Sequence, residues 1–370
     1  MANLDIAYRR LTNQHIARPV STSPAEVVRQ LGAVQAQDYR AALWALGLRL
    51  ENASETAIEE ALSEGKVLRT HIMRPTWHYV EPEDIRWLLD LTGPRVEGVA
   101  AGYYRNLGLD AEIFKLTDKL IAYNLRDNQH LTKAELGRVF TEAGLDVSNQ
   151  LRLTYIIFHA ELTGLVCNGA RQGNEITYAL LDERVPPTPP RTREEAVIEL
   201  VRRFFTSHGP ATIPDFTWWS GLTAADARLG LDSLKSELLQ ETIDGQVYWT
   251  SAERRPVQDL QDDLYLLPNF DEYVVSYKNR QAIEDLNLTP DLTDRRNYLF
   301  NHLIVINGLA SGLWKRKITP KQVLITYEPF RNFTGAENAA LQAEADRYGR
   351  FVGLPVALET GRVAVYGEKK

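Results

Sequence analysis

The chain of 370 residues is too long for one ordinary hydrophobic core, so we expect roughly two to four domains. With 44% hydrophobic and 25% charged residues it has an ordinary globular composition, and its apolar runs are far shorter than a membrane-spanning helix needs. The formal net charge of −7 argues mildly against a nucleic-acid partner, although a basic concave surface can coexist with an acidic exterior.

The start of the sequence and its use of cysteine indicate a cytoplasmic protein. The first residues show neither a basic segment nor an apolar segment of the kind that directs secretion. The single cysteine, Cys167, excludes an internal disulfide and a four-cysteine metal site, which fits a reducing compartment. We expect Cys167 to be a small, buried apolar residue.

Residues 1–100 are predicted to form a helical unit that ends in two strands. Ser23, Pro24 and Glu26 have the types and spacing of a strong helix start, with a capping serine and a proline at the first helical position. Later in this unit, β-branched and aromatic residues fill 66–80 on both sides of a proline. Helices followed by such a two-stranded ribbon are typical of a winged helix.

A short polar stretch separates two helices of this first unit. Gly32 is expected to end one helix, and Asp38 is expected to cap the next. Gln35, Ala36 and Gln37 are therefore predicted to lie in a tight connection, where the side chains of the two glutamines reach out of the packed body.

The same order of helices and strands returns twice. Residues 101–185 carry a helical pattern, a capping box that begins at Thr132, another helix and two short strands. Residues 186–192 hold four prolines and are predicted to be a linker. Residues 193–255 contain three helix starts and a hairpin turn at Asp244. We therefore expect three winged-helix units in tandem.

Residues 256–370 are predicted to form a β-rich cap on the third unit. One amphipathic helix, 336–347, interrupts a series of short strands. The expected strands are 264–267, 273–277, 303–306, 314–318, 323–327, 356–358 and 362–365. The fold class is thus predicted to be α+β and mainly α, with tandem winged-helix (helix-turn-helix) domains and a β-rich C-terminal domain.

Motifs that indicate a bound nucleotide, a serine nucleophile or zinc are absent from the sequence. There is no glycine-rich phosphate loop, no dinucleotide fingerprint and no nucleophile elbow, and the seven histidines form no HExxH pattern. We therefore expect no cofactor and no metal. Asp271 and Glu272 have side chains suited to metal binding or to acid-base chemistry, but solvated carboxylates in a turn are the favoured interpretation.

Five runs in the same order relate nearly the whole chain to one known family. They are Gly32-Ala-Val-Gln-Ala-Gln-Asp38, Arg69-Thr-His-Ile-Met-Arg-Pro-Thr-Trp-His78, Gly164-Leu-Val-Cys-Asn-Gly169, Trp218-Trp-Ser-Gly-Leu-Thr223 and Leu266-Leu-Pro-Asn-Phe-Asp-Glu-Tyr273. With them the chain resembles the AlkZ-like (AlkZ/YcaQ) winged-helix DNA glycosylases. The resemblance implies tandem winged helices around a basic channel and the removal of alkylated purines from DNA, including purines in interstrand crosslinks.

The same resemblance implies a catalytic role for Gln35 and Gln37. The family carries glutamine, a hydrophobic residue and glutamine in its catalytic loop, and its other branch has aspartate at the second polar position. This chain therefore looks closer to the AlkZ branch. Ala36 is the smallest choice for the middle position, which implies a more loosely packed loop. A role for Asp38 as a base is left open.

Two basic stretches supply the predicted DNA contacts. Strand alternation puts Arg69 and His71 on one face, where they can meet phosphate or the lesion, and Trp77 is suited to stacking on a base. For the first stretch, the alternative is a wing whose aromatic residues belong to the core and whose histidines are hydrogen-bonded by neighbouring groups. For the second stretch, 315–317, the alternative is a solvated strand end. The predicted contacts are Arg69, His71, Arg74, Trp77, His78, Lys315, Arg316 and Lys317.

These patterns favour a monofunctional, metal-free DNA glycosylase for N7- or N3-alkylated purines. Neither glutamine can act as a general base or form the Schiff base of a lyase, but an alkylated purine is already a cationic and therefore good leaving group. Double-stranded DNA is the expected partner, without an obligate protein partner, so the cytoplasmic protein would be found on the nucleoid. The competing hypothesis is a non-enzymatic winged-helix DNA-binding protein, for instance a transcriptional regulator.

Overall fold

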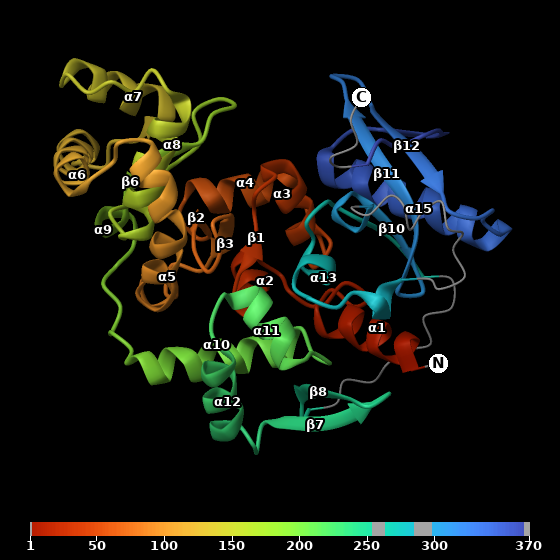
Figure 1. Ribbon diagram of the computed structural model, residues 1–370. Helices are drawn as coiled ribbons and strands as arrows, with labels where there is room; N and C mark the ends of the chain where they lie inside the picture. Colours follow the sequence, from red (N-terminus) through yellow and green to blue (C-terminus); the bar gives the residue numbers. More distant parts are fainter. Residues whose placement is uncertain (1, 254–262, 285–297, 366–370) are drawn as a thin grey trace.

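A computed structural model describes residues 2–253, 263–284 and 298–365 of the chain. Its architecture is mixed α/β, and the described residues form four separate sheets (Figure 1). Within these ranges, no helix combines the length and the apolar character needed to cross a lipid bilayer. The predicted mixture of helices and small sheets is confirmed, whereas the division into winged-helix units and the domain boundaries stay predictions.

The N-terminal part consists of helices that surround a small antiparallel sheet. Its elements are α1 (Ala2–Asn13), α2 (Pro24–Leu31), β1 (Val34–Gln35), α3 (Tyr39–Gly47), α4 (Glu55–Ser63), β2 (Leu68–His71) and β3 (Trp77–Val80), with the strand order β1-β3-β2. The predicted caps are confirmed. Ser23 forms a capping box with Glu26, Gly32 ends α2 with a φ of 82°, and the Asp38 side chain caps α3.

The second part repeats this order of helices and strands. It consists of α5 (Ile85–Asn106), α6 (Ala111–Leu125), β4 (Leu131–Thr132), α7 (Lys133–Glu142), α8 (Gln150–Leu162), β5 (Val166–Asn168), β6 (Thr177–Leu180) and the short α9 (Leu181–Arg184), with the strand order β4-β6-β5. The capping box at Thr132 and the burial of Cys167 are confirmed. Helix α5 has 22 residues and runs through residue 100, so the first two parts are joined by continuous helix.

The third part follows a segment, 186–192, that contains neither helix nor strand, as predicted. Its elements are α10 (Arg193–Ser207), α11 (Ile213–Ser220), α12 (Ala224–Ser233), β7 (Leu238–Ile243) and β8 (Gln246–Ser251). Asp244 and Gly245 connect the two strands with φ angles of 49° and 76°. Positive φ at both turn residues is what a tight hairpin requires, so the predicted turn is confirmed.

The C-terminal part is a five-stranded sheet that packs against one long helix. Its elements are β9 (Leu264–Leu267), α13 (Glu272–Val275), η1 (Gln281–Ile283), η2 (Tyr298–Phe300), β10 (Leu303–Ile306), β11 (Leu309–Ile318), β12 (Val323–Pro329), α15 (Gly335–Val352) and β13 (Val356–Thr360). The strand order is β13-β12-β11-β10-β9, and only the β12–β13 pair is parallel.

Two strands predicted in this last part are wrong. Residues 273–277 lie mostly in helix α13, because Asp271 caps the backbone N–H of Tyr273 at 2.9 Å and starts a helical turn there. A short run of buried apolar residues fits a strand or a helix equally well, so the pattern alone did not separate them. Residues 362–365 belong to neither a strand nor a helix.

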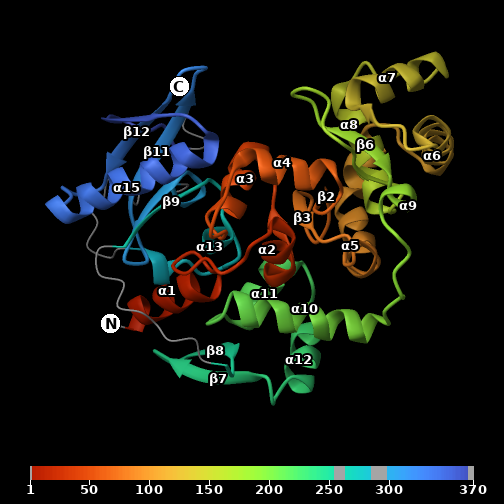
Figure 2. The same ribbon diagram turned by 180° about the vertical axis from the view of Figure 1, so that it is seen from behind.

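Three clusters of buried apolar side chains organise the described residues. The first joins α2, α3 and α4 to the C-terminal sheet, the second joins β2 and β3 to α10 and α11, and the third lies among α5 to α8. Ala36 belongs to the first cluster and Ala33 to the second. Strand β1 therefore lies at the centre of the molecule (Figure 1), and both views show helices α2, α3 and α4 between the second, third and C-terminal parts (Figures 1 and 2).

A buried ion pair holds the N-terminal helices against the C-terminal part. The Arg49 guanidinium donates to both carboxylate oxygens of Asp271, at 2.9 and 2.8 Å, and their side chains are 1% and 0% exposed. Arg49 also donates to the Gln14 side-chain oxygen at 2.9 Å. Such a pair offsets its own desolvation only while both charges and their hydrogen bonds are present.

Replacing Asp271 by asparagine is therefore expected to lower the free energy of unfolding by about 3–5 kcal/mol, because the Arg49 charge stays buried without its partner. Urea denaturation at pH 7 measures this. Asp232→Asn is the matched control, since Asp232 pairs with Lys235 on the surface, where the side chains are 70% and 71% exposed. The control should leave stability nearly unchanged. Similar losses in both variants would contradict the assignment.

Candidate active site

The glutamine loop lies at the edge of the N-terminal sheet. Gln35 ends β1 and is paired with His78 of β3, and the Ala36 N–H donates to the Trp77 carbonyl at 2.7 Å. Ala36 is fully buried, Gln35 is half-buried and Gln37 is exposed. The expected tight connection thus contains a two-residue strand, which fixes the direction of the Gln35 side chain and leaves Gln37 in the following bend.

Gln35 is held at both its main chain and its side chain. Its backbone N–H donates to the Glu272 carboxylate at 2.7 Å, and Arg74 Nη2 donates to its side-chain oxygen at 2.9 Å. Arg74 follows β2 and is half-buried. The carboxamide of Gln35 is therefore oriented before any ligand binds, which is the condition for preorganised polar catalysis.

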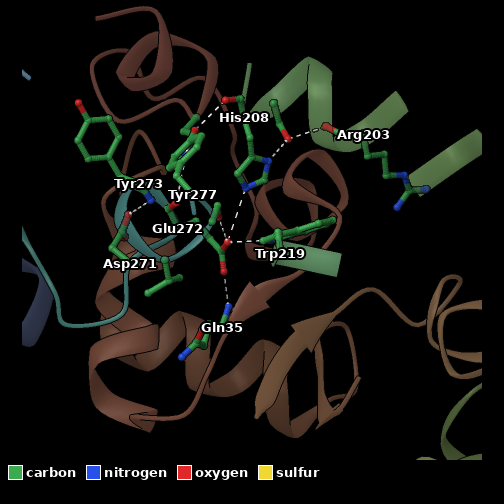
Figure 3. A network of polar contacts seen from close by, with 12 residues as sticks. Gln35, Arg203, His208, Trp219, Asp271, Glu272, Tyr273 and Tyr277 are labelled. Atoms are coloured by element: carbon green, nitrogen blue, oxygen red, sulfur yellow. Dashed lines mark hydrogen bonds and ion pairs between the residues drawn. The ribbon is translucent and has the colours of Figure 1, made fainter. Parts of the chain in front are cut away.

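Glu272 lies at the centre of a buried polar network (Figure 3). One carboxylate oxygen accepts from Gln35, and the other accepts from Trp219 Nε1 at 3.0 Å and from the Ser276 hydroxyl. His208 Nε2 lies 3.6 Å from that second oxygen. Glu272 and Asp271 are both fully buried, so the interpretation of this pair as solvated turn carboxylates is wrong. The sequence did not indicate the contact with Gln35.

Burial and hydrogen bonding act in opposite directions on Glu272. Burial raises its pKa, but the neighbouring His208, Arg74 and Ser276 outweigh that effect and hold the pKa below its ordinary value. Burial lowers the pKa of His208, against the raising effect of Glu272. The two shifts both favour a carboxylate at Glu272 and an unprotonated imidazole at His208.

Several of the predicted DNA contacts lie inside the protein. Arg69, His71 and His78 are 7%, 4% and 0% exposed. Arg69 donates to the Ala36 carbonyl at 3.1 Å and lies over the Trp77 ring, so it supports the loop from within. Their predicted contacts with DNA stay untested, but direct contact is not available to these side chains as they are packed here.

The two histidines of this stretch are bonded by protein groups. His71 Nδ1 bonds the Glu161 carboxylate, which also accepts from Trp77 Nε1 at 3.2 Å. His78 Nδ1 bonds the Thr76 carbonyl at 2.9 Å, and burial, with Arg74 adding to it, lowers the pKa of His78 to about 3. This arrangement agrees with the alternative in which neighbouring groups bond the histidines. His78 is therefore a neutral imidazole on β3, opposite Gln35.

A cleft with a volume of about 640 Å³ opens beside Asp38, the residue after Gln37, although neither glutamine lines it. Four separate segments form its walls, namely the start of α3, the loop between β5 and β6, the residue before β10, and β11. The lining residues are Asp38, Tyr39, Arg40, Arg171, Asn174, His302, Lys315 and Arg316. Four of these are lysines or arginines and one is an aspartate, so the walls are basic despite the acidic sequence.

The cleft collects some predicted residues and adds two that the sequence analysis missed. Lys315 and Arg316 line it, whereas Lys317 is exposed on the same strand without being a lining residue. Arg40 and Arg171 were missed. Arg40 follows the glutamine motif closely enough to have been found from sequence, but Arg171 reaches the site only because its loop folds back over Tyr39, with its guanidinium 5.3 Å from that ring.

Two further features of the surface and interior are relevant to the choice of site. A hollow of about 740 Å³ lies along the proline segment, lined by residues such as Pro186, Pro189 and Ile198, and it includes none of the predicted site residues. Among residues 2–253, 263–284 and 298–365, no cluster of three or more histidine, cysteine or acidic side chains has the geometry to hold a metal ion. The basic cleft is therefore the candidate site.

Comparisons with known proteins place the chain in a family. A family model described as DNA glycosylase AlkZ-like matches residues 28–351. A curated relative from Streptomyces sahachiroi, named interstrand DNA cross-link repair glycosylase, is 23% identical over 372 residues, which cover 94% of this chain and 97% of the relative. The solved structure of Streptomyces sahachiroi DNA glycosylase AlkZ has the same fold, with a TM-score of 0.75 at 21% identity over 97% of this chain and 99% of that one. The chain belongs to the AlkZ-like family of DNA glycosylases.

Proposed function

We propose that the protein hydrolyses the N-glycosidic bond of N7- and N3-alkylated purines in double-stranded DNA, including purines joined in interstrand crosslinks. Family membership supports the reaction class, and the name of the Streptomyces relative supports the crosslink. The observation that carries the proposal is the position of the loop. Gln35 is fixed on its inner side, and Gln37 is exposed next to a cleft with four basic side chains.

The chemistry asked of two amides is modest because the substrate is already activated. The bond between C1′ and the base nitrogen breaks, and its electron pair neutralises the positive charge of the alkylated base, which leaves as a neutral molecule. Water adds to C1′ and releases its proton to solvent. The enzyme has to hold the nucleotide, position that water and stabilise the sugar cation, which oriented dipoles can do. Removal of an undamaged base would need an acid that the two glutamines do not supply.

The two glutamines have different tasks in this proposal. The oxygen of Gln35 accepts from Arg74 but has a second lone pair, which can face the sugar cation. Gln37 has an exposed side chain and is assigned to the attacking water. Asp38 caps α3 through one oxygen and accepts from Asn269 at 3.3 Å through the other, so we assign it a role in holding the cleft wall rather than one as a base.

DNA binding is assigned to the basic cleft and to the repeated helix-and-sheet parts around it, which we propose to be tandem winged helices. Arg40, Arg171, Lys315 and Arg316 come from three different segments, so together they can follow a phosphate backbone across the site. Because this positive charge is local, the net charge of −7 does not oppose it. Neither glutamine is a nucleophile for a lyase step, and the reaction as written needs no metal.

The glutamines are tested with a duplex that contains N7-methylguanine, followed by hot alkali to cleave abasic sites. Gln35→Ala and Gln37→Ala should each lower the single-turnover rate constant about tenfold or more, equivalent to about 1.4 kcal/mol or more of transition-state stabilisation. Duplex affinity should stay near wild type. Gln342→Ala, on the exposed face of α15, is the matched control. Absence of abasic sites with the wild type would refute the enzyme, and unchanged rates in both loop variants would remove the glutamines from the mechanism.

The basic cleft is tested with Lys315→Gln. Loss of one phosphate contact should weaken binding of damaged and undamaged duplexes equally and lower the slope of log affinity against log salt by about 1. Fluorescence anisotropy over a range of salt concentrations measures both. Lys321→Gln is the control, because Lys321 is exposed at the turn beyond β11 and lies outside the cleft. An unchanged salt slope for the cleft variant would exclude Lys315 from the DNA path.

The order of rates on two substrates tests how the base is reached. Flipping a paired base costs a few kcal/mol, and a crosslinked base that is already displaced from its stack needs less. We therefore expect release of a crosslinked purine to be at least as fast as release of the corresponding monoadduct under single-turnover conditions. Gel separation of unhooked strands measures the first rate and alkaline cleavage the second. Crosslink unhooking that is much slower than monoadduct release would contradict this expectation.

A further inference from the structure

Strand β1 is an edge strand, and a side chain from a distant part of the sequence bonds its free edge. Along β1 the Ala36 N–H points to β3, so the preceding N–H, that of Gln35, points to the open edge of the sheet. There it donates to Glu272, which is 237 positions away in the sequence. An unpaired strand edge usually meets solvent or another strand. Here it meets a buried carboxylate instead.

The two oxygens of this carboxylate have separate partners from different parts of the molecule. The first accepts from the Gln35 N–H, and the second accepts from Trp219 of α11 and from Ser276. Burial lowers the pKa of the nearest imidazole, His208, whose Nε2 lies 3.6 Å from the second oxygen. The hydrogen bonds to the Glu272 carboxylate thus come from neutral donors, namely a backbone N–H, an indole and a hydroxyl (Figure 3).

A positive charge lies on the other side of Gln35. Arg74 donates to the Gln35 carboxamide oxygen at 2.9 Å, and its charge favours ionised Glu272. The formal charge in direct contact with that carboxamide is therefore a guanidinium. A guanidinium opposes a cation that forms on a bound sugar, since like charges repel strongly where solvent is excluded. A buried carboxylate behind the same residue offsets this.

We propose that Glu272 is a positioning residue for base removal, which fixes the main chain of Gln35 and whose buried negative charge favours the sugar cation of the transition state. The inference rests on the proposed function, because it assigns the charge to the same reaction. Glu272 does not touch the substrate in this mechanism. It acts through Gln35 and through the electrostatic field at the loop.

The first test uses two abasic-site analogues in otherwise identical duplexes. A protonated pyrrolidine mimics the sugar cation in charge and shape, whereas tetrahydrofuran has the shape alone. The wild type should bind the pyrrolidine duplex at least tenfold more tightly. The intact protein is used, so no variant has to fold for this comparison. Equal affinity for the two duplexes would overturn the inference.

The second test removes the charge and keeps the side-chain volume. Glu272→Gln should lose most of the preference for the cationic duplex and lower the single-turnover rate constant about tenfold, with affinity for the tetrahydrofuran duplex within threefold of wild type. Because the glutamine NH2 group would oppose the Trp219 N–H, the same change is also made in a Trp219→Phe background. There the amide oxygen can still accept from Gln35. Trp219→Phe alone is the reference for this double variant, so the effect of the charge is read from the difference between the two.

Three controls distinguish loss of the Glu272 charge from misfolding and from failure of the proposed reaction. Glu344→Gln changes another buried carboxylate, on α15, which is 7% exposed and lies outside this network, and it should behave as wild type in both assays. Hydrogen exchange of the loop peptide reports whether the Gln35 N–H stays protected. Folded, protected Glu272→Gln protein with a wild-type rate and preference would overturn the inference. Failure of the proposed function is a different result, namely a wild type that releases no alkylated base.

Discussion

The geometry of the site depends on the hydrogen bonds that the buried Glu272 carboxylate accepts. This carboxylate brings together β1 of the N-terminal part, α11 of the third part and α13 of the C-terminal part at one point inside the molecule. Burying an ionised carboxylate is costly unless hydrogen bonds replace its hydration. Here a backbone N–H, an indole and a hydroxyl replace that hydration. Two of the three hydrophobic clusters meet beside this point, at Ala33 and Ala36, so packing and polar contacts fix the loop together.

This arrangement makes the loop rigid on one side and open on the other. Gln35 is hydrogen-bonded through its main chain and through its carboxamide. Ala36, which the sequence analysis expects to loosen the loop, is fully buried. Gln37, one residue later, is exposed. Oriented dipoles stabilise a developing charge without reorganisation, whereas a water molecule needs an accessible partner. Gln35 lies in strand β1 and Gln37 lies in the bend that follows, so the loop has one bonded and one exposed carboxamide within three residues.

The surface charge follows the same division between inside and outside. The acidic net charge is spread over the whole protein, while Arg40, Arg171 and Lys315 converge on one cleft from segments that are far apart in the sequence. Arg69 and His71 are predicted DNA contacts, yet both are buried, and Arg69 supports the loop from within. A basic residue in a strand meets solvent or core according to what packs on that face, and strand alternation alone does not decide which.

Local sequence was sufficient for the features whose physical cause is local. The caps at Ser23 and Thr132, the turn at Asp244, the proline segment and the glutamine loop all depend on residues a few positions apart, and the family resemblance followed from runs of the same length. The helix at 273–277, the inward position of Arg69 and the contact between Gln35 and Glu272 needed the tertiary structure. Those depend on which distant segments pack together, because burial and neighbouring donors, rather than residue type, decide whether a carboxylate is a solvated turn residue or the buried anchor of the glutamine loop.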